Sequence, residues 1–320
     1  KGKFGLLVFA LSYGFITNFY IGYMLGIFSA IYFVYYIFAI QTYEDKPFSE
    51  RAIKAGIFGI SAISAILISM FMILPVVKSL SLGKFEFSDP DYTVTENFNI
   101  INTFGKLLPN SYDTVRMEGL PFIYTGTTVL VLAICYFAHK KISARERIGS
   151  GILLGLMLVF MYIRPVDMFW HGGQMPNWLP YRYSFMISFL LATFAAEAFE
   201  RLETLKNKVI ALSTVGIIGV ALYFESLNLE KLDGIEVILP AIGIVAFTGI
   251  FLYVLKKDYH NGSIAVALAV FVGVELFFNT ITSLDKADRD IVYSTRPSYT
   301  DIILPTREVV TEVYNRDESF

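Results

Sequence analysis

The residues best suited to chemistry gather in one segment, residues 164–183, which reads RPVDMFWHGGQMPNWLPYRY. Arg164 and Arg182 lie at its ends, and a guanidinium stays charged and presents planar donors that match phosphate oxygens. His171, one of three histidines in the chain, can donate a hydrogen bond or move a proton near neutral pH. Together these residue types predict a pocket for a phosphate-bearing substrate.

The other side chains of this segment suit an amphipathic ligand. Gln174 and Asn177 can bond sugar hydroxyls, and aromatic rings can pack on a sugar ring. The rings concerned are those of Trp170, Trp178, Tyr181 and Tyr183. Their alternative role is packing at the membrane surface, because Trp and Tyr favour the headgroup level. For these four rings the two interpretations stay open.

A second polar cluster, NFYIGYM, occupies residues 18–24. Asn18, Tyr20 and Tyr23 offer hydrogen bonds and are expected to form a wall of the same pocket. The alternative for Asn18 is a turn with a helix cap, a position that asparagine favours.

Glu275 stands about twelve residues into the last apolar stretch, where an ionisable group is costly. It needs a partner or a proton. A structural ion pair with Arg164 or Arg182 is one interpretation, and a functional carboxylate is the other.

Asp89 and Asp91 form a D-x-D pair within SDPDY. Such a pair can supply oxygen ligands to a divalent cation. Asp and Pro are also common in ordinary turns, and the turn is the favoured interpretation. The cofactor requirement stays open, because no other feature indicates a metal.

The composition places these residues in a membrane protein. Hydrophobic residues make up 55% of the 320 residues and charged residues 17%, whereas soluble domains carry about 25% charged residues. No nucleic-acid partner is expected, because 26 Lys and Arg against 28 Asp and Glu leave no basic surplus. The single cysteine, Cys135, allows no internal disulfide.

A spanning helix needs about 20 mostly apolar residues, and we predict about nine in an all-α polytopic fold. Two share residues 4–40, interrupted at Asn18 and Gly22, and the others cover residues 55–77, 120–138, 148–163, 184–199, 209–224, 237–255 and 263–283. This makes residues 1–283 a transmembrane domain with outer-face loops at 78–119 and 164–183. Residues 284–320 are predicted to start an extracytoplasmic segment.

The orientation follows from the positive charges of the short loops. Short loops on one side of the predicted spans hold 14 Lys and Arg, whereas the short loops on the other side hold three, Arg164, Arg182 and Lys231. Cytoplasmic loops are the ones enriched in Lys and Arg. Residues 164–183 are therefore predicted to face the cell exterior, where the chemistry should take place.

Two stretches resemble the YfhO family of bacterial membrane proteins. They are NFYIGYM at residues 18–24, followed by a long apolar run, and FWHGGQMPNWLPYRYSF at residues 169–185, entering a span. The resemblance extends over the whole chain in order and spacing. Family members are longer at both ends, so the chain is expected to be an internal portion of a longer protein.

The resemblance implies a GT-C-type glycosyltransferase of the bacterial cell membrane. Such enzymes take a sugar from a polyprenyl-phosphate carrier at the outer face, and YfhO relatives are linked to glycosylation of teichoic acids. Their catalytic carboxylate commonly lies in the first outer loop, which this chain is expected to lack. The catalytic residue is therefore unassigned, with Asp89, Asp91 and His171 as candidates.

Two other functions remain open from the sequence. A transporter or flippase for a lipid-linked sugar would use the same phosphate contacts but needs a polar path across the bilayer. A non-catalytic membrane scaffold would tolerate loss of the polar side chains around His171.

Overall fold

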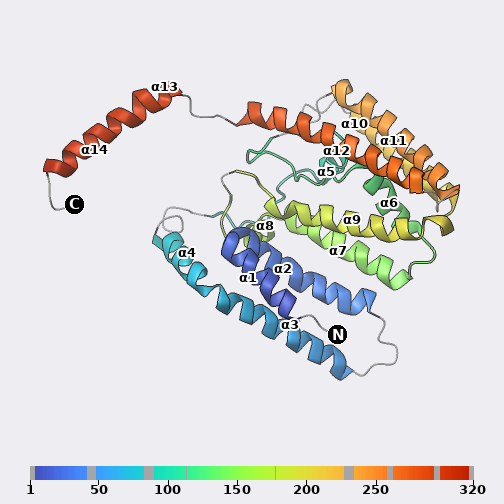
Figure 1. Ribbon diagram of the computed structural model, residues 1–320, viewed down its shortest axis with the longest axis horizontal. Helices are drawn as coiled ribbons and strands as arrows, with labels where there is room; N and C mark the ends of the chain where they lie inside the picture. The colour runs from blue at the N-terminus through green and yellow to red at the C-terminus, as the bar shows by residue number, and fades with distance from the viewer. Residues whose placement is uncertain are drawn as a thin grey trace.

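The computed structural model describes residues 4–41, 48–82, 90–112, 114–176, 178–226, 234–257, 262–291 and 296–316. These residues form helices joined by loops, and they contain no strand beyond one isolated antiparallel bridge between Glu96 and Ile163. The predicted all-α class is thus confirmed for the described part of the chain. Figure 1 shows the helices as an elongated bundle.

The first two helices, α1 (Phe4–Thr17) and α2 (Phe19–Tyr35), form a tight antiparallel pair. The predicted break lies at Asn18, whose side chain accepts a hydrogen bond of 3.1 Å from the N–H of Ile21 and so caps α2. Gly22 lies inside α2 and does not interrupt it. A Cβ at Gly22 would stand 2.8 Å from the backbone of Gly14, so the missing side chain lets the two helices touch.

A long pair of helices lies alongside α1 (Figure 1). It consists of α3 (Phe48–Ile68) and α4 (Met70–Leu82), separated by a single turn residue, Ser69. Ser69 donates its side-chain hydroxyl to Ala65 O at 2.9 Å, which keeps the two helices nearly continuous. Most apolar side chains of this pair are exposed, as expected of a surface that faces lipid.

The central and C-terminal helices complete the bundle. They are α5 (Ile100–Gly105), α6 (Thr127–Ala138), α7 (Ala144–Tyr162), α8 (Arg164–Trp170), α9 (Phe185–Glu200), α10 (Asn207–Ser226), α11 (Gly234–Lys257) and α12 (Gly262–Asp290). Helix α6 packs along α9, and α10 packs along α11. The core lies between α2, α6, α7, α9, α10 and α11. Short helix α13 (Arg296–Ser298) and α14 (Leu304–Arg316) extend away from the bundle in Figure 1.

Six of the described helical segments are long and apolar enough to cross a membrane. They are Phe19–Ile40, Ser49–Ile68, Arg182–Glu200, Asn207–Phe224, Pro240–Lys257 and Gly262–Asp290. Three more, α1, α4 and α6, are apolar but shorter. These segments confirm a polytopic membrane fold, whereas the count of nine spans stays a prediction.

Two predicted segments differ from the observed helices. The fourth predicted span began at residue 120, but α6 begins only at Thr127, because residues 120–126 are not helical and Gly126 has a positive φ of 93°. The last helix, α12, continues to Asp290, past the predicted boundary at residue 283.

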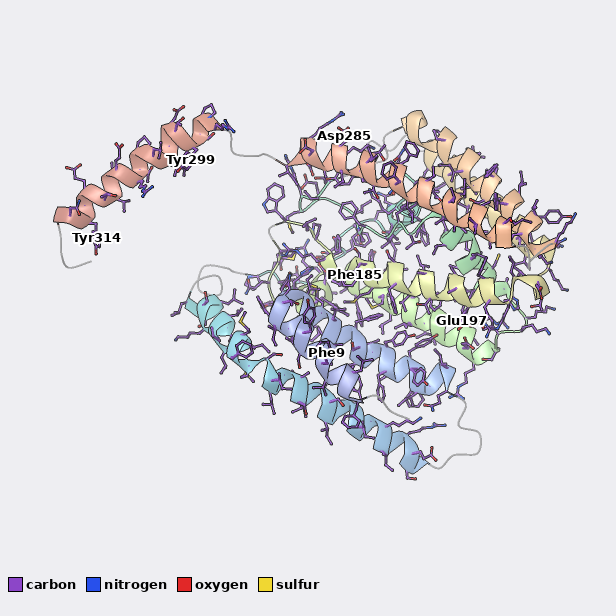
Figure 2. All side chains as sticks on the ribbon, in the orientation of Figure 1. Phe9, Phe185, Glu197, Asp285, Tyr299 and Tyr314 are labelled. Atoms are coloured by element: carbon purple, nitrogen blue, oxygen red, sulfur yellow. The ribbon has the colours of Figure 1, made fainter. Side chains whose placement is uncertain are left out.

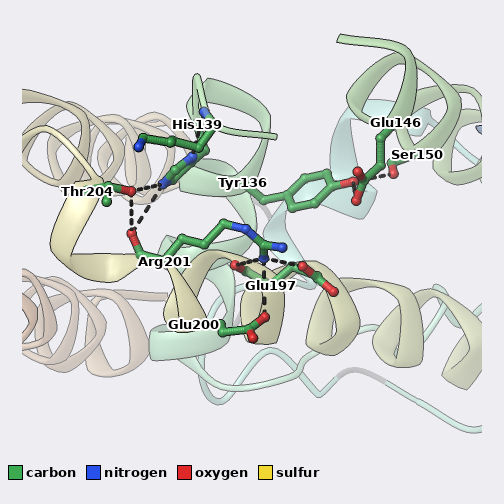
Figure 3. A network of polar contacts seen from close by, with 9 residues as sticks. Tyr136, His139, Glu146, Ser150, Glu197, Glu200, Arg201 and Thr204 are labelled. Carbon is green, nitrogen blue, oxygen red and sulfur yellow. Dashed lines mark hydrogen bonds and ion pairs between the residues drawn. The ribbon is translucent and has the colours of Figure 1, made fainter. Parts of the chain in front are cut away.

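The bundle has two ends with different polar contents. Figure 2 places Phe185 at one end of α9 and Glu197 toward the other. At the Glu197 end, Arg201 contacts Glu197 and Glu200, and its carbonyl oxygen lies 3.3 Å from Nε2 of His139 (Figure 3). The contact with His139 ties the end of α9 to the α6–α7 connection.

Candidate functional site

A cavity of about 1310 Å³ lies at the Phe185 end of the bundle. The polar lining residues Asn18, Tyr20, His171, Gln174 and Arg182 are here called the polar wall. The apolar lining residues of α1, α3 and α4, here called the apolar wall, are Phe15, Ile66, Ile73, Val77 and Leu80. The cavity therefore suits a ligand with a polar head and an apolar tail.

The loop that carries much of the polar wall starts at the end of α8. Pro165 occupies the first turn of this helix, a favoured position, and Gly172 and Gly173 follow it with φ of 72° and 81°. Leu179 and Tyr181 also have positive φ, 52° and 55°, which is uncommon for residues with a side chain. Such backbone strain persists only where the surroundings enforce it.

Three hydrogen bonds hold this loop. The N–H of Leu179 donates to the carbonyl of Val115 at 2.6 Å. The hydroxyl of Tyr92 donates to the carbonyl of Gly173 at 2.9 Å, and that of Tyr23 donates to Phe169 O, also at 2.9 Å. The loop is thus fastened to α2 and to residues from the 90–126 region.

Arg182 is the cation of the polar wall. Its Nη2 donates to the carbonyl of Trp178 at 3.0 Å and its Nε to that of Leu179 at 3.3 Å. Its guanidinium carbon lies 5.1 Å from the ring centroid of Tyr20, a cation–π distance. These contacts fix the guanidinium beside the cavity, while Nη1 makes no hydrogen bond to the described residues.

His171 lies between two other polar side chains. Its Nδ1 is hydrogen-bonded to the hydroxyl of Tyr20, and its Nε2 lies 3.5 Å from Oδ1 of Asp167. Asp167 precedes His171 by one helical turn, so α8 presents both on the same face. Their side chains are 1% and 0% exposed, although the imidazole borders the cavity.

Asp167 is held by two more partners behind the cavity. The hydroxyl of Tyr183 donates to Oδ1 at 2.8 Å, and the side-chain amide of Asn97 donates to Oδ2 at 3.3 Å. Trp170 stacks on Tyr183, with ring centroids 4.4 Å apart and planes 11° apart. Trp170 is 1% exposed and does not line the cavity, so it supports the polar wall from behind.

Arg164 lies away from the cavity. Its Nη1 is 2.8 Å from Oδ2 of Asp91, and neither residue lines the cavity. The backbone N–H of Thr93 donates to Asp91, and this bond together with Arg164 holds the pKa of the Asp91 carboxyl below its usual value. Asp89 lies outside the described residues, and these residues contain no group of three His, Cys, Asp or Glu side chains placed to hold a metal.

The structure brings seven of the predicted site residues to the cavity. They are Asn18, Tyr20, Tyr23, His171, Gln174, Tyr181 and Arg182. Trp178 is 46% exposed and lies outside the lining, and Asn177 lies outside the described residues. Asn18 lines the cavity and caps α2 at once, so its two interpretations are compatible.

Of the interpretations left open for Glu275, an ion pair with Arg164 or Arg182 is not found among the described residues. Glu275 is buried in α12 and its Oε1 accepts hydrogen bonds from the hydroxyl of Tyr124 and, at 2.7 Å, from the backbone N–H of Thr127. The carboxylate therefore takes the first turn of α6 and a phenol as partners in place of a cation. Its other oxygen, Oε2, is buried with no hydrogen bond among the described residues.

Sequence reasoning missed Asp167 and the apolar wall. The D-x-x-x-H spacing of Asp167 and His171 was visible, because residues four apart share a helix face. The wall supplied by α3 and α4 had no such signal, since apolar residues in a predicted span look alike whether they face lipid, protein or a cavity.

The chain was compared with known proteins. A protein-family model described as "Bacterial membrane protein YfhO" matches residues 1–320. Comparison with curated proteins gave no match, and comparison with solved structures gave none.

Proposed function

We propose that this chain, which belongs to the YfhO family of bacterial membrane proteins, is a glycosyltransferase that moves a sugar from a polyprenyl-phosphate carrier to a cell-envelope acceptor such as teichoic acid. The membrane part of this statement rests on the family and on the apolar helices. The donor, the acceptor and the reaction are the proposal.

One observation carries the proposal: a single cavity joins a cationic polar wall to an apolar wall. A lipid-linked sugar has a matching order of parts, with sugar, phosphate and hydrocarbon chain in sequence. Arg182 would bind the phosphate, because a guanidinium suits phosphate oxygens. Gln174 and Asn18 would bond sugar hydroxyls, and the side chains of α4 would contact the hydrocarbon chain.

The chemistry of the transfer needs charge stabilisation at the leaving group. The acceptor hydroxyl attacks the anomeric carbon as the bond from that carbon to the phosphate oxygen breaks. Negative charge then grows on the phosphate, so a fixed guanidinium stabilises the transition state more than the bound donor. Arg182 is the residue proposed for this role, because its contacts to two carbonyl oxygens hold it at the cavity.

The proposed orientation puts the cavity at the outer face of the cell membrane. Its support is the excess of Lys and Arg in the loops at the opposite side of the predicted spans. Polyprenyl-linked donors used there would be supplied by reactions that build or translocate the carrier-linked sugar.

The direct test reconstitutes the full-length protein in lipid vesicles with a polyprenyl-phosphate donor labelled in its sugar and with purified teichoic acid. We expect label to move to the polymer. Movement of labelled donor between leaflets without transfer would show a flippase. The proposal would also be overturned by binding of the donor with neither transfer nor translocation, which is the result a scaffold gives.

Substituting Ile73 by Trp is expected to raise KM for a long-chain donor by roughly tenfold, because the bulkier ring fills the space beside α4. KM for a donor with a two-isoprenoid chain should change little. The matched control is Leu74→Trp, since Leu74 is the next residue of α4 but is 60% exposed and outside the cavity lining. Equal effects of Ile73→Trp on both donors would argue against hydrocarbon binding at the apolar wall.

A further inference from the structure

A line of contacts runs from Asp167 through His171 to Tyr20, which borders the cavity. The Tyr20 hydroxyl is hydrogen-bonded to Nδ1 of His171, and the opposite nitrogen of the ring faces Asp167 at 3.5 Å. The histidine and aspartate side chains are fully buried, whereas Tyr20 is only partly buried and lines the cavity. The phenol is therefore the member of this line that a ligand can reach most directly.

The position of the carboxylate selects the direction of the hydrogen bonds. A negative charge beside Nε2 favours the tautomer that carries its proton on Nε2. Nδ1 then keeps its lone pair and accepts the proton of the Tyr20 hydroxyl. This is the order of groups in an acid–base–nucleophile triad, with a phenol in the place of the terminal hydroxyl. In the structure Nε2 approaches Asp167 at 3.5 Å without a hydrogen bond to the described residues.

The carboxylate is placed to stabilise a protonated imidazole. Tyr183 and Asn97 each donate to one oxygen of Asp167, so its side chain is held toward the ring of His171. At 3.5 Å the carboxylate and a protonated ring would form an ion pair in a buried setting, where charge interactions are stronger than in water.

Arg182 adds a positive charge on the other side of Tyr20. Its guanidinium carbon stands 5.1 Å from the centroid of the phenol ring. A cation over this ring stabilises the negative charge that grows on the phenol as its proton leaves. The charged and titratable groups that face His171 and Tyr20 are thus Asp167 from α8, Tyr183 and Arg182 from the turn before α9.

From these contacts we infer that Tyr20 is the general base of the transfer reaction, with His171 as the proton store and Asp167 as its positioning residue. This inference rests on the proposed function. The acceptor oxygen forms its bond to the anomeric carbon, and the bonding pair to phosphate leaves with the polyprenyl phosphate. The acceptor proton passes to the Tyr20 oxygen as the phenol proton moves to Nδ1 of His171. The imidazolium afterwards releases that proton to water.

The test uses the full-length protein in vesicles and compares wild type with Tyr20→Phe, which keeps the ring that contacts Arg182. We expect kcat to fall by at least about 100-fold, the usual size of a general base contribution. KM for the donor and binding of polyprenyl phosphate without sugar should stay within about twofold, because the phosphate contact is kept.

The pH profile separates this role from a structural one. In wild type, kcat should fall toward low pH, because a protonated His171 cannot accept the phenol proton. The residual rate of Tyr20→Phe should lack this fall. Asp167→Asn should also lower kcat, since the imidazolium loses its counter-charge, while Tyr162→Phe is the matched control. Tyr162 likewise donates to a carboxylate, Glu96, at 2.8 Å but lies outside the cavity lining.

The possible outcomes distinguish the two proposals. If wild type transfers sugar and Tyr20→Phe keeps the wild-type kcat or the fall at low pH, the inference is overturned and the glycosyltransferase stands. If wild type binds polyprenyl phosphate but transfers no sugar, both are overturned. Retained binding of polyprenyl phosphate by Tyr20→Phe shows that the variant is folded, and a variant that does not bind is replaced by Asp167→Asn for the same measurements.

Discussion

Substituting Arg182 by alanine is expected to lower sugar transfer by at least about 100-fold, comparable with loss of a fixed donor at a developing negative charge. The guanidinium lies at the cavity, held by the carbonyl oxygens of Trp178 and Leu179. Its loss removes the cation nearest to the proposed phosphate position. The measurement is the rate of label transfer from the polyprenyl-phosphate donor by purified protein in vesicles.

Two further variants sharpen this prediction. Arg182→Lys keeps the charge but not the planar donors, so it should restore only part of the rate. Arg289→Ala is the control, because Arg289 pairs with Asp285 on the surface with 76% of its side chain exposed. An Arg182→Ala protein that transfers sugar at the rate of Arg289→Ala would remove this arginine from the mechanism.

Substituting Glu275 by leucine is expected to destabilise the protein by roughly 2–5 kcal/mol, because one buried and one partly buried donor lose their acceptor. These donors are the hydroxyl of Tyr124 and the backbone N–H of Thr127. The N–H belongs to the first turn of α6, whose donors have no partner within the helix. The measurement is the thermal unfolding midpoint of the purified protein in detergent.

Glu275→Gln is the matched variant for this test. A glutamine keeps one oxygen that can accept from both donors and loses only the charge. We expect its unfolding midpoint to remain close to that of wild type. A midpoint for Glu275→Gln as low as that for Glu275→Leu would show that the charge matters more than the accepted hydrogen bonds.

The sequence predicted the helical membrane fold because apolar stretches of spanning length are a strong signal. It also placed the break between the first two helices, because Asn18 is a favoured cap in an otherwise apolar run. The start of α6 was placed too early, since residues 120–126 are largely apolar yet not helical and α6 begins only after Gly126. Hydropathy registers the apolar character of a residue but not its backbone conformation.

Much of the polar wall could be predicted because its residues lie close together in two short segments. The sequence could not predict that only Arg182 lies at the cavity, because Arg164 and Arg182 look equivalent at the ends of one loop. Arg164 pairs with Asp91, which is 73 residues away. The partners of Glu275 were missed for a related reason. A backbone N–H can satisfy a carboxylate as well as a cation can, and nothing in the sequence shows which N–H lies close to it.

The positive φ angles of Leu179 and Tyr181 have a consequence for ligand recognition. A loop that is already locked in an unfavourable backbone conformation does not have to be ordered by the molecule it binds. The conformational entropy of this loop is lost when the protein folds, so ordering the loop does not reduce the affinity for the ligand. Binding to this loop should therefore be rapid and close to rigid, with selectivity set by the shape that the loop has before the ligand arrives.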